Sequence, residues 1–313
     1  MAPRGPRLMV LAAVALVAGA GAAAGSPNRV AALGGEARFL VDPVNVFDFP
    51  ALAVPLAHAD LELFAEWGGA VVPMSRSAVG LFANRPTPDL RRYNAYLDTA
   101  GSPALAALEV RPWLDAVAGF RLGGEVLLGL AGAYAFDLED AGMTEASASQ
   151  ARLAAGLRLG GPRRRLDVAA HLCRHRLRDA GAATARHQAD GDLYGLELRG
   201  RWAATDLVLI VPTLYVQAGG LAIEPARRDV RRGGLGLAAN LRPRSGVLAL
   251  AGLLLTYDGI EEARPAQATT DQWSASLPTL VLGGEAQVGS MVFRVGARHE
   301  TRWSRAEAAG RAG

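Results

Sequence analysis

Apolar and polar residues alternate with a period of two along most of the chain after residue 59. Leu153, Leu157 and Leu159 fall on one side of this alternation, whereas Arg152 and Arg158 fall on the other. Successive side chains of a β-strand point to opposite faces, so the pattern predicts strands with one apolar and one polar face. It recurs over 114–122, 194–201, 234–242 and 293–300.

Twelve strands are predicted from such segments. Most are about ten residues long, the length that a tilted strand needs to cross a membrane. They cover residues 60–67, 77–84, 113–122, 125–136, 150–159, 165–177, 191–202, 206–216, 233–242, 246–257, 275–284 and 290–303.

The connections between these strands alternate in length. Short turns are predicted at 123–124, 160–164, 203–205, 243–245 and 285–289, and long polar loops at 84–112, 137–149, 178–190, 217–232 and 258–274. A soluble sandwich has no reason for this regularity, whereas outer-membrane barrels have short periplasmic turns and longer extracellular loops. The predicted fold class is therefore all-β, an antiparallel up-and-down transmembrane β-barrel of 12–14 strands.

Alternation alone leaves open which face lies inside, because a soluble sandwich turns its apolar face inward. In a barrel, Leu157 and Leu196 would face lipid, and Arg158 and Arg199 a water-filled lumen. The charged residues on the polar face would form a structural network or a selectivity lining. The candidates for lining the lumen are Arg152, Arg158, Glu197, Arg199, Arg201, Arg294, Arg298 and Glu300.

The first 24 residues have the pattern of a cleaved signal peptide. Arg4 and Arg7 precede an uncharged apolar stretch, 8–20, and small residues follow at 22–24. The longest later apolar stretch, 247–256, is about half the length of a membrane-spanning helix. The mature chain is therefore expected to be a soluble exported protein or, as we favour, a barrel in the cell outer membrane.

Composition excludes several classes of protein. Of the 313 residues, 50% are hydrophobic and 20% charged, which is too apolar for disorder. The lone Cys173 excludes an intrachain disulfide framework. All 33 basic residues are arginine and the formal net charge is only +3, so the sequence gives little support to a nucleic-acid partner.

The lead before the first strand carries a family resemblance. A small, glycine-ending stretch at 31–35 precedes Asp42, and the stretch 45–51 reads NVFDFPA. This layout resembles Gram-negative outer-membrane barrels of the FadL-like and PorV-like kind, in which an Asp and an Asn-Pro-Ala step precede the first strand. Here four residues separate Asn45 from Pro50. The resemblance implies a 14-stranded barrel, plugged by its N-terminal segment, that passes small hydrophobic molecules.

Strand parity completes the predicted domain organisation. With the long loops outside, strands 60–67 and 290–303 leave both chain ends outside, whereas bacterial barrels have even strand counts. Residues 25–58 are therefore expected to hold a plug or a further strand, around 38–47, ahead of a barrel at 59–303. Residues 304–313 would be a polar tail of a chain that stops short, with a seam between first and last strands.

Two clusters have candidate chemistry. His171, Cys173 and His175 share one strand face, but the first and third lie about 13 Å apart, too far for one ion. We therefore predict no metal and no cofactor. The basic run 163–165 is expected to be a solvated turn beside anionic headgroups or, alternatively, an anion-attracting rim of the lumen.

No nucleophile, phosphate-loop or zinc-protease motif is present, so we do not expect an enzyme. The leading prediction is a channel or transporter for a small solute, polar or hydrophobic. The alternatives are a structural or surface-interaction barrel without transport, and a secreted soluble β-protein. The expected partners are outer-membrane lipid and a small solute, and the oligomeric state is left open.

Overall fold

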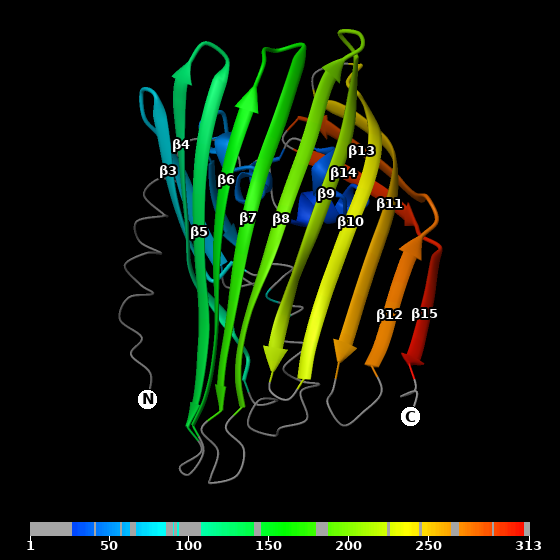
Figure 1. Ribbon diagram of the computed structural model, residues 1–313. Helices are drawn as coiled ribbons and strands as arrows, with labels where there is room; N and C mark the ends of the chain where they lie inside the picture. The colour runs from blue at the N-terminus through cyan, green and yellow to red at the C-terminus, as the bar shows by residue number, and fades with distance from the viewer. Residues whose placement is uncertain are drawn as a thin grey trace.

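The computed structural model describes residues 27–40, 42–56, 58–62, 67–85, 90, 93, 108–140, 145–179, 187–223, 226–243, 246–263, 269–289 and 291–309. The strands among these residues form one antiparallel up-and-down sheet (Figure 1). This confirms the predicted all-β class. The predicted signal peptide, 1–24, lies outside the described residues. No helix in the described ranges is long and apolar enough to span a membrane.

Short helical elements precede the strands. They are α2 (Pro27–Ala32), η1 (Ala37–Phe39), η2 (Pro43–Phe47) and η3 (Pro50–Ala53). The strands are β1 (His58–Glu62), β2 (Trp67–Pro73), β3 (Ser77–Ala83), β4 (Arg111–Gly123), β5 (Val126–Asp140), β6 (Glu145–Leu159), β7 (Arg164–Asp179), β8 (His187–Ala203), β9 (Val208–Ile223), β10 (Ala226–Leu241), β11 (Val247–Ala263), β12 (Thr269–Ser276), β13 (Thr279–Val288), β14 (Met291–His299) and β15 (Arg302–Ala309).

The last four strands are two broken spans. β12 and β13 both pair with β11, one along each half of it, and β15 and β14 pair with them in turn. The break between β12 and β13 contains Pro278, which has no backbone N–H to donate. The 15 strands therefore make 13 spans. In the part of the chain that the structure describes, no ladder joins β1 to β14 or β15.

Two expectations at the N-terminus are wrong. The segment 60–67 is not one strand, because β1 ends at Glu62 and β2 begins at Trp67. Residues 38–47 form η1 and η2 rather than a further strand. Asp42 and Asn45 form a capping box at the start of η2, and Pro43 cannot donate to a strand ladder. Two strands, β1 and β2, occupy residues 58–73, where only one strand was predicted.

Most strands are longer than predicted. Much of the expected loops 137–149, 217–232 and 258–274 is strand, and only two residues separate β9 from β10. These extensions have polar residues on both faces, so they lack the alternation from which strands were predicted. Backbone pairing does not depend on an apolar face. For the same reason the expected polar tail from residue 304 is strand as far as Ala309, paired with β12. The predicted turn at 123–124 lies one residue further along, because Gly123 ends β4 paired with Val126. The turn residues are Gly124, with a φ of 52°, and Glu125.

The two faces of the sheet differ in polarity. The inner face carries the N-terminal segment, defined as residues 27–56, and the outer face is opposite (Figure 1). On the outer face Leu153 is 61% exposed and Leu196 is 40% exposed, whereas Arg158 and Arg199 are buried on the inner face. The alternation therefore assigned the faces correctly. The apolar face points outward, contrary to the arrangement in a soluble sandwich.

The N-terminal segment lies in close contact with the inner face, where glycines make room for it. A Cβ at Gly129 would overlap backbone atoms of Pro50 and Ala51, and one at Gly252 would overlap the ring of Phe39. Apolar side chains of the segment form two buried clusters with inner-face residues of the sheet. The space enclosed by the curved sheet is thus filled at this level.

Candidate functional site

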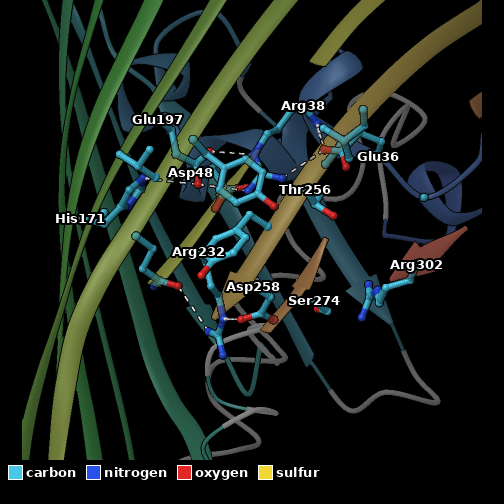
Figure 2. Close-up of a pocket in the computed structure, with 18 of the residues that line it drawn as sticks. Glu36, Arg38, Asp48, His171, Glu197, Arg232, Thr256, Asp258, Ser274 and Arg302 are labelled. Carbon is cyan, nitrogen blue, oxygen red and sulfur yellow. Dashed lines mark hydrogen bonds and ion pairs between the residues drawn. The ribbon is translucent and has the colours of Figure 1, made fainter. Parts of the chain in front are cut away.

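A pocket of about 370 Å³ lies between the N-terminal segment and the inner face of the sheet (Figure 2). Side chains from β6 to β12 contribute to its wall, together with β14, β15 and the residues around η1. Nine of the 20 residues that line it are charged, and both signs occur. The charged residues are Arg38, Arg152, Arg232, Arg298, Arg302, Glu36, Asp48, Glu197 and Asp258.

Arg38 stands at the centre of the wall that the N-terminal segment provides. Its Nε and Nη2 atoms donate to the carboxylate of Glu197 at 3.2 and 3.4 Å, and Nη1 donates to Glu36 at 3.2 Å. Its guanidinium also lies 4.0 Å from the ring centroid of Tyr215. These contacts fix one guanidinium between two carboxylates and an aromatic face, which joins the segment to β8 and β9.

Arg152 extends this network toward β6 and β7. Its Nη2 atom lies 3.2 Å from Asp48 Oδ1 and 3.2 Å from His171 Nδ1. His171 Nε2 in turn lies 4.0 Å from Glu197 Oε1. The charges on this wall therefore form one connected chain. It holds the N-terminal segment to three neighbouring strands.

The opposite wall is more open. Arg232 of β10 donates to Asp258 of β11 at 2.8 Å and approaches Gln217 at 3.5 Å. Arg298 and Arg302 both donate to Glu300, at 3.1 and 2.7 Å. Paired but partly exposed charges can exchange their partners for those of a solute, so this wall can contact a small polar or zwitterionic molecule.

The charges of the wall stabilise one another's ionised forms. Burial raises the pKa of Asp48, but the positive charges of Arg152 and Arg38 outweigh it and hold the pKa below its ordinary value of 3.8. Burial lowers the pKa of Arg38, but Glu197, Glu36 and Asp48 outweigh it and raise the pKa. Both groups are therefore ionised at neutral pH.

The candidate lumen residues are divided among three places. Arg152, Glu197 and Arg298 line the pocket. Arg294 donates to Glu285 at 2.7 Å, and Glu300 accepts from its two neighbouring arginines. Among the described residues, no ion pair joins the candidates at 197–201 to those at 294–300. The remaining three, nearer the short turns, are Arg158, Arg199 and Arg201.

Arg199 faces inward as expected, but its expected contact with water is not found, because it is fully buried. Its guanidinium donates to Asp167 at 2.8 and 3.0 Å, to the carbonyl of Leu40 at 2.9 Å and to Asn45 Oδ1 at 3.0 Å. Asp167 also accepts from Arg158, at 2.6 and 3.1 Å. These residues anchor the N-terminal segment rather than line an open channel.

His171, Cys173 and His175 lie on the inner face, and Cys173 Sγ lies 3.8 Å from His175 Nε2. His171 contacts Arg152, whereas His175 Nε2 lies 2.8 Å from Gln150 and its ring packs on Tyr93. Within the described ranges no group of three His, Cys, Asp or Glu side chains is placed to hold a metal.

Sequence reasoning missed the residues that complete the pocket. Arg38 and Asp48 lie in the lead, which carried no strand pattern, whereas Arg232 and Asp258 fell in predicted loops. The charges within the otherwise apolar lead were the available signal for the first two. The sequence around Arg232 and Asp258 did not distinguish them from ordinary charged residues of a loop.

No protein-family model, curated protein or solved structure matches this chain. The resemblance to FadL-like and PorV-like barrels therefore stays a prediction.

Asp48→Asn should destabilise the protein at pH 7, and this deficit should shrink as the pH falls below about 4. The pKa of Asp48 is lowered by folding. Its charge therefore stabilises the folded state above the ordinary carboxyl pKa, and that stabilisation is lost as the pH falls through the lowered value. Urea unfolding of wild type and variant between pH 7 and pH 3 measures this. An equal deficit at both ends of the range would show that the ion pair with Arg152 does not contribute.

Proposed function

We propose that this chain is an outer-membrane β-barrel protein that transports a small polar solute through its inner pocket. The observation that carries the proposal is the polarity of the two faces. Large apolar side chains are exposed along the outer face of most strands, whereas charged side chains are buried on the inner face. Soluble monomers rarely expose contiguous apolar surface on this scale, but lipid would cover it.

Aromatic residues support the same placement. On the outer face of β8, Tyr194 and Trp202 are both more than half exposed, and Leu196 and Leu198 lie between them. Eight residues of strand span about 26 Å, or about 20 Å of height at a tilt of about 40°. Membrane barrels have an apolar band about 25 Å tall between two aromatic girdles. Tyr194 and Trp202 are therefore spaced to lie at the two membrane–water interfaces.

The pocket favours a polar solute over a hydrophobic one. Five arginines and four carboxylates line it, and they pair across neighbouring elements. A hydrophobic molecule would leave these charges desolvated without a new partner. A zwitterion or a small anion could replace the lost water with charge-assisted hydrogen bonds.

Membrane fractionation tests the placement. The protein should co-sediment with outer membranes on a density gradient and require detergent for its release. Recovery in the soluble periplasmic fraction without detergent would exclude the barrel and leave the secreted β-protein. Uptake of a small amino acid into proteoliposomes then tests transport, with a matched Asp258→Asn variant to test the pocket.

One observation favours a second function. The N-terminal segment packs on the inner face, where hydrogen bonds from the buried Arg199 and an ion pair between Arg29 and Glu285 anchor it. A permanently closed barrel would act through its outer loops as a structural or surface-interaction protein. Protein that fractionates with the outer membrane but gives proteoliposomes no uptake above protein-free vesicles would support this alternative.

A further inference from the structure

Four arginines gather on the inner face near the short turns. They are Arg158 of β6, Arg165 of β7, and Arg199 and Arg201 of β8. These strands are neighbours in the sheet, and Asp167 lies among the arginines. Arg158 and Arg199 share the carboxylate of Asp167. This leaves an excess of positive charge around Arg165 and Arg201.

Arg165 and Arg201 stand directly opposite each other in the ladder between β7 and β8. Like charges in this position repel each other and destabilise the sheet. Arg165 donates to the carbonyl of Gly161 at 3.0 Å, but neither arginine forms an ion pair with another described residue. Arg201 makes no hydrogen bond within the same ranges, and its Nε atom is shielded from solvent without a partner.

Among the described residues, the nearby acids do not pair with Arg165 or Arg201, since Asp167 is already shared by Arg158 and Arg199. Glu125, in the turn between β4 and β5, lies beside Gly161 but forms no ion pair with Arg165 or Arg201 in the described part of the chain. Asp206, in the turn after β8, is paired with the exposed Arg163 at 3.6 Å. A partly buried pair of guanidiniums that no carboxylate bonds can donate hydrogen bonds to the oxygens of a phosphate or carboxylate.

We propose that Arg165 and Arg201 form a binding site for a small oxyanion, such as phosphate or a carboxylate, at the short-turn end of the lumen. The bound anion would accept hydrogen bonds from both guanidiniums and neutralise the excess charge. This site is separate from the pocket and goes beyond the proposed transport. Its test measures binding and not passage across a membrane. The anion site can therefore be disproved while the transport proposal stands, and transport can be disproved while the anion site stands.

The test is the thermal stability of the full chain in detergent, titrated with inorganic phosphate at constant ionic strength balanced with chloride. Wild type should gain stability in a saturable manner, because the anion binds the folded state. Arg165→Gln and Arg201→Gln should each weaken the apparent affinity for phosphate about tenfold or more. Arg163→Gln, which changes an exposed turn residue, should bind phosphate as wild type does.

A second readout separates binding from a structural role. In chloride alone, Arg201→Gln should be at least as stable as wild type, because the substitution removes repulsion from Arg165. A series with phosphatidylglycerol in the micelles distinguishes a lipid headgroup from a free anion as the source of the oxygens. The proposal is overturned if wild type shows no saturable response to either probe, or if Arg201→Gln responds as wild type does.

Discussion

Asp167→Ala is expected to destabilise the folded protein by about 3–5 kcal/mol, the cost of leaving a buried charge without its partner. Asp167 accepts from two arginines, Arg158 on β6 and Arg199 on β8, and all three side chains are buried. Its removal leaves two guanidiniums in a site that water does not reach. The free energy of unfolding in urea, measured in detergent micelles, gives the size of the effect.

Asp206→Ala is the matched control. Asp206 also pairs with an arginine, but both side chains are almost fully exposed in a turn, so the substitution should change stability little. Equal unfolding free energies for the two variants would show that burial around Asp167 does not set the strength of its ion pairs.

Gly129→Val is expected to disrupt the packing of the N-terminal segment on the inner face of the sheet. A side chain at Gly129 would overlap backbone atoms of Pro50 and Ala51, which cannot rotate away as a side chain can. Overpacking of this kind costs about 1–3 kcal/mol, and a clash with backbone lies at the upper end of that range. Trypsin should then cleave after Arg38 in the variant much faster than in wild type.

Gly132→Val places the same substitution three residues along the same strand. A Cβ at Gly132 would meet only ordinary contacts with Leu153 and Arg152. Cleavage after Arg38 should therefore stay slow in this control. If Gly129→Val leaves cleavage equally slow, the segment is not held at that glycine.

Alternation was enough to predict the class of fold and the direction of the side chains. Leu196 and Arg199 lie on the faces that the period of two assigned to them, because the pleat leaves no other choice. The ends of strands were less predictable, as at the β9–β10 connection, where Arg227, Arg228 and Asp229 continue the ladder. Their charge predicted a loop, but hydrogen bonding between backbones does not require apolar neighbours.

The candidate site could be predicted only in part. Arg152 and Glu197 were found because they lie on strands with clear alternation, and they do line the pocket. Arg38 and Asp48 were missed because pairing between a coiled lead and distant strands leaves no periodic trace. The burial of Arg199 was missed for the same reason, since Leu40 and Asn45, which surround it, lie 159 and 154 residues away.

The long-range contacts of the N-terminal segment affect the rate of folding. Arg29 bonds to Asp42 close by and to Glu285, which is 256 residues away. The part of the chain that is synthesised early can therefore complete its contacts only when the late strands have paired. Contacts of such long range slow folding, because loop closure must precede the gain from them. Protection of Arg38 from trypsin should consequently appear last during refolding, after the strand ladders have formed.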